Sequence, residues 1–193
     1  MNLQTRVVNI LTQPKSEWQV IGAEQTDVKT LYRDYIIILA AIPAICTFLG
    51  LSLIAGAFRG FWLTSGLTAA ISSYVTALVG TFVAAIVVEK LAPNFNSAGD
   101  TNQALKLVAY AHTPVWIAGV LTLVVFLIPL MLIAVLYAIY LFYLGMPVVM
   151  KTPQDKVVPY MIVSAVIIIV INVCLSFLLG AMTGASLGYG RFV

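Results

Sequence analysis

The feature that most constrains this chain is a stretch of 44 residues, 107–150, that contains no Asp, Glu, Lys or Arg. A membrane-spanning helix needs about 20 apolar residues, because each residue rises about 1.5 Å and the hydrocarbon core is about 30 Å thick. As a single helix the stretch would be about 66 Å long, which is too long even for a tilted span. It therefore predicts a hairpin of two spans, with Pro129 at the turn.

Three further charge-free stretches, residues 35–58, 60–88 and 157–190, are each long enough for one span. Only 9% of all residues are charged, compared with about 25% in soluble domains, and 62% are hydrophobic. We therefore predict an all-α, polytopic integral membrane protein with five transmembrane helices. The expected spans are residues 35–56, 66–88, 105–127, 130–149 and 157–180, which form a domain of residues 35–193 after an N-terminal region of residues 1–34.

The positive residues are distributed unequally between the two sides that these spans define. Eight of the ten Lys and Arg residues lie in the N-terminal region or in and beside the loops after the second and fourth spans, whereas Arg59 and Arg191 lie on the other side. Because cytoplasmic loops carry an excess of positive residues, we predict a cytoplasmic N-terminus and an outer C-terminus. All seven acidic residues share the cytoplasmic side, so the net charge of +3 does not indicate nucleic-acid binding.

The N-terminal region predicts two short amphipathic helices. Pro14 ends the first helix, and Ser16 is the expected cap of the second, which places Trp18 and Ile21 on one side. The two helices either lie in the cytoplasmic leaflet, with Trp18 at headgroup level, or pack against the cytoplasmic end of the bundle. Apolar residues recur at helical spacing in the first helix: Leu3, Val7, Ile10 and Leu11.

The segment between the fourth and fifth spans has the pattern of a helix start. Thr152 is the expected N-cap, Pro153 the first helical residue, and Asp155 places a negative charge at the positive end of the helix. Gly145 and Pro147 are expected to loosen the end of the fourth span, where the chain leaves the membrane.

Two lysines flank this helix start and belong to no cap. Lys151 and Lys156 are expected at the cytoplasmic surface, where each positive charge near anionic lipid contributes about 1 kcal/mol of attraction. One hypothesis is that the pair forms, with Tyr143 and His112, a cytoplasmic contact site for lipid headgroups or a protein partner. The other is that the lysines only fix the topology of the chain.

Two stretches resemble a known family. "YLGMPVVMKTPQDKVVPY" is similar to the segment that joins the last two spans of the Ypt/Rab-interacting-protein (YIP) family, and "LKLVAYAHTPVWIAGVL" resembles that family's third span, with Tyr110 and Pro114 as its Tyr and Pro. Eukaryotic members are associated with Rab GTPases and vesicle traffic and carry a longer polar N-terminal region. This chain does not show that region, so the resemblance implies a bacterial-type, multi-pass inner-membrane protein. We predict that it acts through contacts with the membrane and with proteins rather than by catalysis.

Polar residues within the spans are the remaining functional candidates, because a polar side chain in the hydrocarbon core costs free energy. They either line a pathway in a small oligomeric transporter or channel for an ion or solute, or they form hydrogen bonds that hold the bundle together. Because no carboxylate lies deep in a span, we favour hydrogen bonding. The candidates in the third to fifth spans are Tyr110, His112, Tyr137, Tyr140, Tyr143 and Asn172.

Small residues predict close helix packing at two places, within the bundle or between copies of the chain. Repeated GxxxG spacing near the C-terminus at Gly180, Gly184 and Gly188 predicts either such packing or a flexible outer tail, because Gly is a poor helix former, and we favour packing up to Gly184 and a loose chain beyond it. The second span carries one small-residue face, formed by Ala69, Ser73, Ala77, Gly80 and Ala84.

No pattern in the sequence predicts an enzyme or a cofactor. The chain lacks HExxH, paired-Cys, GxxxxGK[ST] and Rossmann glycine motifs, and its single histidine is His112. Cys46 and Cys174 both fall within predicted spans and indicate apolar packing rather than a metal site. The expected partners are the lipid bilayer and, by contact, other membrane proteins or a second copy of the chain.

The topology can be tested by accessibility labelling of single-cysteine variants. We expect Ser97→Cys, Gln154→Cys and a cysteine at the N-terminus to be labelled only from the cytoplasmic side, and Gly190→Cys only from outside. Labelling of Gln154→Cys from the outer face would rule out the five-span arrangement.

Overall fold

The computed structural model describes residues 2–55 and 61–188, with side chains over residues 2–50 and 66–177 apart from 125, 175 and 176. Every element within these ranges is helical, which confirms the predicted all-α fold. The main helices are α1 (Leu3–Thr12), α2 (Pro14–Ala23), α3 (Val28–Leu31), α4 (Ile37–Ala55), α5 (Phe61–Leu91), α6 (Thr101–Ala118), α7 (Met131–Val149) and α8 (Gln154–Gly188). Shorter helical segments are η1 (Tyr32–Ile36), η2 (Ala92–Phe95), η3 (Gly119–Leu123) and η4 (Val125–Leu130).

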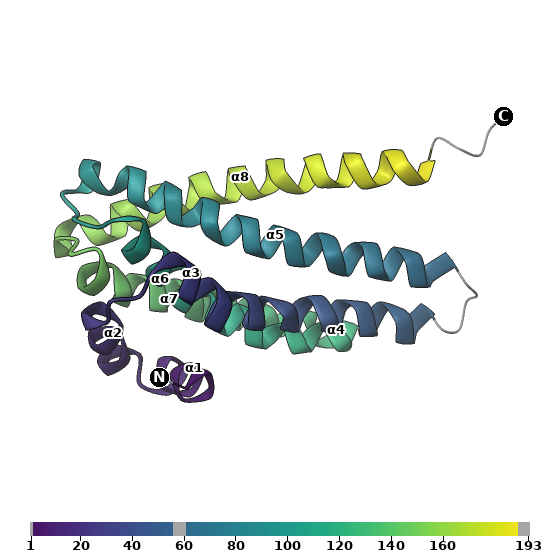
Figure 1. Ribbon diagram of the computed structural model, residues 1–193, viewed down its shortest axis with the longest axis horizontal. Helices are drawn as coiled ribbons and strands as arrows, with labels where there is room; N and C mark the ends of the chain where they lie inside the picture. Colours follow the sequence, from purple (N-terminus) through teal and green to yellow (C-terminus); the bar gives the residue numbers. More distant parts are fainter. Residues whose placement is uncertain (1, 56–60, 189–193) are drawn as a thin grey trace.

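Five helical segments are long and apolar enough to cross a membrane, as predicted. α4 packs against α5 and η3, α6 packs against α7 and α5, and α8 packs against α5. Figure 1 shows these long helices with roughly aligned axes, and α1 and α2 lie together at one end of them. The candidate spans are Val28–Gly50, Gly66–Phe95, Thr101–Leu123, Phe126–Val149 and Gln154–Cys174.

The long charge-free stretch forms a hairpin, but its turn is at Val124 rather than at Pro129. Val124 has extended backbone angles (φ −126°, ψ 108°) and separates the 3₁₀ segments η3 and η4. Pro129 lies inside η4, because a proline needs no N–H partner in a turn that leads into a helix. The hairpin packs closely on α4 at Gly119, where an added Cβ would lie 2.6 Å from Cβ of Pro43.

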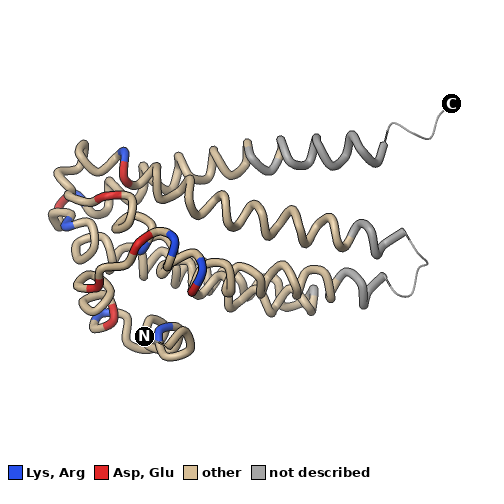
Figure 2. Tube along the Cα trace, viewed as in Figure 1, with Lys and Arg blue, Asp and Glu red and all other residues tan. Residues whose placement is uncertain are grey.

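The described charged residues gather at one end of the bundle, which we call the polar end (Figure 2). Away from this end, the described parts of the long helices are tan in that figure, which means that they carry no Lys, Arg, Asp or Glu. Arg59 and Arg191, which the sequence assigns to the opposite side, lie outside the described residues. Which side of the membrane the polar end faces stays a prediction.

The two N-terminal helices meet at Pro14. Asn2 caps α1 by accepting a hydrogen bond from the backbone N–H of Gln4 (3.2 Å). Pro14 is the first residue of α2, so Gln13 and not Ser16 precedes the helix. The prediction for Ser16 was wrong because a proline suits the first helical position, which starts the helix before Ser16. The Ser16 hydroxyl instead donates to the carbonyl of Gln13 (3.0 Å).

The turn between α7 and α8 differs from prediction by one residue. α8 begins at Gln154, so Pro153 precedes the helix and Thr152 lies outside it. The Thr152 hydroxyl is buried and accepts a hydrogen bond from Oγ of Ser97 (2.9 Å), which joins this turn to the loop before α6. The expected N-cap role of Thr152 is therefore wrong, and its hydroxyl instead links two polar-end loops.

The small-residue face of α5 includes one close contact with a neighbouring helix, at Gly80. Gly80 and Ala84 are buried, and Ala69, Ser73 and Ala77 are half-buried. A Cβ added to Gly80 would lie 2.8 Å from Oδ1 of Asn172, so the glycine allows α8 to approach α5. The packing predicted for Gly180 and Gly184 falls outside the described side chains.

The contact at Gly80 can be tested by substitution. Gly80→Leu should lower the free energy of unfolding in detergent by about 1–3 kcal/mol, because the larger side chain overpacks the contact with α8. Val79→Leu, at an exposed neighbouring position, is the matched control and should change stability by less than about 0.5 kcal/mol. Equal tolerance of both changes would mean that Gly80 does not set the approach of the two helices.

Candidate functional site

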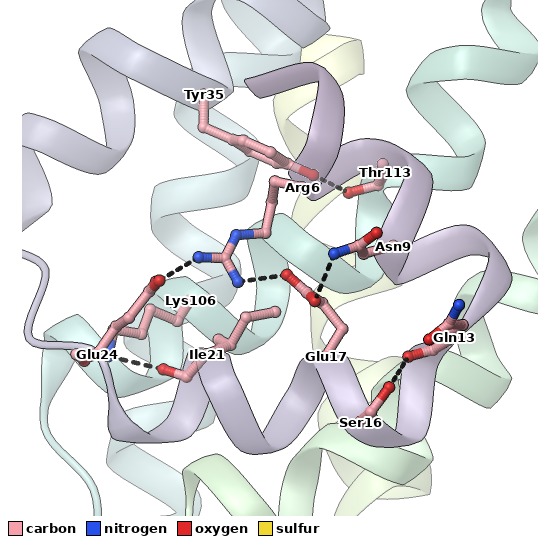
Figure 3. Close-up of polar contacts among 10 residues, drawn as sticks. All are labelled: Arg6, Asn9, Gln13, Ser16, Glu17, Ile21, Glu24, Tyr35, Lys106 and Thr113. Atoms are coloured by element: carbon pink, nitrogen blue, oxygen red, sulfur yellow. Dashed lines mark hydrogen bonds and ion pairs between the residues drawn. The ribbon is translucent and has the colours of Figure 1, made fainter. Parts of the chain in front are cut away.

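A buried ion-pair cluster joins the two N-terminal helices to each other at the polar end (Figure 3). The guanidinium of Arg6 on α1 contacts Oε1 of Glu17 on α2 at 2.5 Å and also pairs with Oε1 of Glu24, at the end of α2. Arg6 and Glu17 are both 4% exposed, whereas Glu24 is half-buried. We call Arg6, Glu17 and Glu24 the Arg6 cluster.

The surroundings of Arg6 keep it charged despite its burial. Burial by itself lowers the pKa of Arg6, but the hydrogen bond to Glu24 and the neighbouring carboxylates outweigh it, so the pKa is raised. The guanidinium also lies 5.5 Å from the ring centroid of Tyr110, within the range of a cation–π contact. Asn9 donates to the second oxygen of Glu17 (3.1 Å). Because the buried charges are paired and hydrogen-bonded, the cluster serves to hold α1 and α2 together.

A second buried cation fixes the end of α2 to α6. Lys106 is 1% exposed, and its Nζ donates to the carbonyl oxygens of Ile21 (3.3 Å) and Glu24. These carbonyls belong to the C-terminal end of α2, where a positive charge stabilises the helix dipole. Figure 3 shows Lys106 reaching this end of the helix.

Trp18 decides between the two interpretations of the N-terminal helices. Its side chain is completely buried, and its ring meets that of Tyr110 edge to face with centroids 6.4 Å apart. A Cβ added to Gly145 of α7 would lie 2.8 Å from Cζ2 of Trp18 and 2.6 Å from Cδ1 of Leu107. Trp18 is therefore a core residue that packs on the bundle, and the alternative of Trp18 at headgroup level is wrong.

Two tyrosine hydroxyls near this cluster are hydrogen-bonded, and one of them, that of Tyr137, was predicted to need a partner. Tyr137 of α7 donates to the carbonyl of Leu11 in α1 (2.8 Å), so its partner comes from the N-terminal helices. Tyr35, which follows α3, forms a hydrogen bond of 2.7 Å with Thr113 of α6. Tyr110 is 5% exposed and lies between Trp18 and Tyr35.

His112 lies apart from these groups. It is exposed at the surface of α6 and lines an apolar groove of about 290 Å³, with its ring tilted against that of Trp116 at 5.7 Å. The groove is formed mainly by α6, α7 and α8, and its lining does not include Tyr143, Lys151 or Lys156. The described geometry thus does not group His112 with the lysines.

The remaining candidates are spread over α6, α7 and α8. Pro114 is buried within α6, Pro147 is half-buried within α7, and Tyr140 lies 5.8 Å from Tyr137 between ring centroids. Asn172 uses its amide to donate to the carbonyl of Ile168 in its own helix (2.8 Å). The exposed candidates are Tyr140, Tyr143, Lys151 and Asp155, and Lys156 is half-buried.

The site that sequence reasoning missed is the Arg6 cluster with Lys106. Its signal was present, because Glu17 and Glu24 lie seven residues apart on the same face of a predicted amphipathic helix. The pairing with Arg6 could not be found from spacing, since it depends on how α1 folds back on α2. Within the described residues, no three His, Cys, Asp or Glu side chains are grouped to hold a metal ion.

Comparison with known proteins agrees with this architecture. The Yip1 domain matches residues 8–176, which is most of the chain and includes α2, the bundle and both polar-end turns. The chain belongs to the Yip1 family. The predicted resemblance to YIP proteins is therefore confirmed.

Curated relatives of this Yip1 family member come from bacteria. The chain is 29% identical over 161 residues to the inner membrane protein YohC of Escherichia coli K12, covering 79% of this chain and 82% of the relative. The same protein from E. coli O6:H1 matches equally well. No solved structure matches the chain. The comparisons and the five candidate spans confirm a multi-pass protein of the bacterial inner membrane.

The Arg6 cluster predicts a specific pattern of stability. Arg6→Leu should lower the free energy of unfolding by about 3–5 kcal/mol, because it leaves the carboxylate of Glu17 buried without its cation. The double variant Arg6→Leu/Glu17→Leu should recover most of this loss. Arg33→Leu, at an exposed arginine paired with Asp34, is the matched control and should cost less than about 1 kcal/mol. Thermal unfolding in detergent measures all three, and a double variant as unstable as Arg6→Leu would contradict the assignment.

Proposed function

We propose that this Yip1 family member acts without catalysis, through contacts that its polar end makes with lipid headgroups or with protein partners. The observation that carries the proposal is the backbone at Lys151. This residue has φ 52°, in the left-handed region that favours glycine, and its side chain is exposed. A lysine costs about 1–2 kcal/mol in this conformation, so its presence is better explained by its charge than by its backbone.

The turn around Lys151 is held firmly enough to present that charge. The carbonyl of Met150 accepts a hydrogen bond from Ala98 (2.9 Å), and Thr152 is joined to Ser97. Lys156 follows in the first turns of α8 and is half-buried. The two lysines therefore lie on adjacent parts of one fixed turn, where charge near a lipid surface or an acidic protein surface is favourable.

The other charged groups of the polar end support contact rather than chemistry. Arg6, Glu17 and Lys106 bind one another or backbone carbonyls, so their charges are used within the fold. His112, the single histidine, faces the apolar groove beside Trp116. Tyr137 and Asn172 donate to backbone carbonyls at separate places, which supports structural hydrogen bonding over the alternative of a transport pathway.

The proposal can be tested with the double variant Lys151→Gly/Lys156→Gln. The glycine suits the left-handed backbone, so stability should be kept or raised, whereas lipid retention and partner recovery after cross-linking should both fall. The matched control is Lys15→Gln/Lys29→Gln, which removes two exposed positive charges from a different part of the protein, the N-terminal region. The proposal is wrong if the variant Lys151→Gly/Lys156→Gln retains lipid and recovers partners as the native protein does and fully complements a deletion strain. The two lysines would then serve only to fix the topology of the chain. Solute flux in proteoliposomes above an empty-liposome control would instead favour transport.

A further inference from the structure

A polar cavity of about 140 Å³ lies at the polar end, bordered by α1, α3, η1 and α6. Its charged lining residues are one cation and two carboxylates: Arg6, Glu24 and Asp34. The charge of Arg6 is already balanced by Glu17, which contacts it at 2.5 Å and does not line the cavity. Asp34 pairs with Arg33, but the side chain of Arg33 is 70% exposed, so solvent screens its charge. The cavity therefore presents negative charge.

Both carboxylates keep acceptor capacity for a further donor. Arg6 contacts Glu24 through Oε1 (Figure 3), and within the described residues Oε2 of Glu24 has no hydrogen-bond partner. Asp34 accepts from Arg33 through both oxygens (2.6 and 2.9 Å), which uses two of its about four lone-pair sites. A donor in the cavity therefore finds an available acceptor on each carboxylate.

Tyr110 supplies a third acceptor and points to a ligand. Its side chain is 5% exposed, and its ring is contacted by the guanidinium of Arg6 and the rings of Tyr35 and Trp18, at 5.5, 4.6 and 6.4 Å from its centroid. Its hydroxyl has no hydrogen-bond partner within the described residues, and it is not enclosed as Nε1 of Trp18 is. Because buried tyrosine hydroxyls usually have a partner, a hydroxyl left accessible in this cavity indicates a bound group.

The mouth of the cavity lies where the polar surface of the bilayer meets the hydrocarbon. Asp34 lines the cavity and forms an exposed ion pair with Arg33, and exposed charges are costly in hydrocarbon, so this rim lies outside the apolar core. Ile37 and Ile38 follow within about one turn of helix and expose apolar side chains. The cavity is therefore at the level of the lipid headgroups.

The lining matches the chemistry of a primary ammonium group. An ammonium has three N–H donors, a positive charge and no acceptor, and the cavity offers three acceptors and an excess of negative charge. A quaternary ammonium has no N–H and is recognised by open aromatic faces, whereas the ring of Tyr110 is covered by its neighbours. The volume of about 140 Å³ corresponds to about four or five water-sized groups of about 30 Å³, enough for an ammonium and the two carbons that follow it.

We propose that this cavity binds a primary ammonium group through Tyr110, Glu24 and Asp34. The level of its mouth favours the headgroup of an ethanolamine phospholipid, and a soluble amine offers the same ammonium group. Neither Lys151 nor Lys156 lines the cavity, so the inference does not rest on the proposed function.

Lipid retention by the purified full chain tests the site. The protein is equilibrated in nonionic detergent micelles with equal amounts of phosphatidylethanolamine and phosphatidylcholine of identical acyl chains, and native mass spectrometry counts the lipids that it retains. We expect about tenfold more phosphatidylethanolamine than phosphatidylcholine, because the choline headgroup carries the same charge but cannot donate a hydrogen bond.

Two substitutions remove acceptors from different parts of the cavity. Tyr110→Phe breaks no hydrogen bond within the described residues and should lower the preference for phosphatidylethanolamine about tenfold. Asp34→Asn, at the exposed rim, should lower it about fivefold. The matched controls are Tyr140→Phe and Asp27→Asn, which should keep the preference because both side chains are exposed and neither lines the cavity.

Calorimetric titration of the protein in lipid-free micelles with ethylamine identifies the source of the ammonium group. Ethylamine binding that Tyr110→Phe weakens, without a preference between the two lipids, would support the ammonium site and assign it to a soluble amine. Equal retention of the two lipids together with no ethylamine binding would overturn the proposal. A preference that neither Tyr110→Phe nor Asp34→Asn changes would also overturn it, and the rim variant keeps this comparison informative if the replacement of Tyr110 alters folding.

Discussion

The pairing of Arg6 with Glu17 and Glu24 is the interaction on which the polar end depends. It takes the cation of α1 and the carboxylate of Glu17 into the interior, where each charge is tolerable only because its partner is present, and the half-buried Glu24 after α2 supplies a second carboxylate. Lys106 then binds the carbonyls at the end of the same helix. The N-terminal helices are therefore part of the core, and Trp18 of α2 is completely buried.

This arrangement divides the molecule into two environments. Toward the far end, the described surfaces of α7 and α8 are apolar and mostly exposed, as expected for helices that face lipid. At the polar end, helices meet through ion pairs, carbonyl contacts and the hydrogen bond between Ser97 and Thr152.

Sequence reasoning succeeded where one residue property was decisive. The charge-free stretches determined the number of spans, and Gly80 was placed correctly at a close helix contact. It failed at Pro129, Ser16 and Thr152, because the ends of helices are located less precisely by sequence patterns than the helices themselves. The partner of Tyr137 could not be predicted either, because Leu11 lies 126 residues away in the chain.

The sequence by itself determined the membrane class, the helical fold, the five spans and the grouping of charges, because hydrocarbon excludes charge and unpaired backbone groups whatever the packing. Only the tertiary structure decided that α1 and α2 pack on the bundle, that Arg6 and Lys106 are buried, and that His112 faces an apolar groove. These features depend on which surfaces meet in space. Short amphipathic helices are compatible with either a lipid surface or a protein surface, and the pairing of charges from α1, α2 and α6 selects between them.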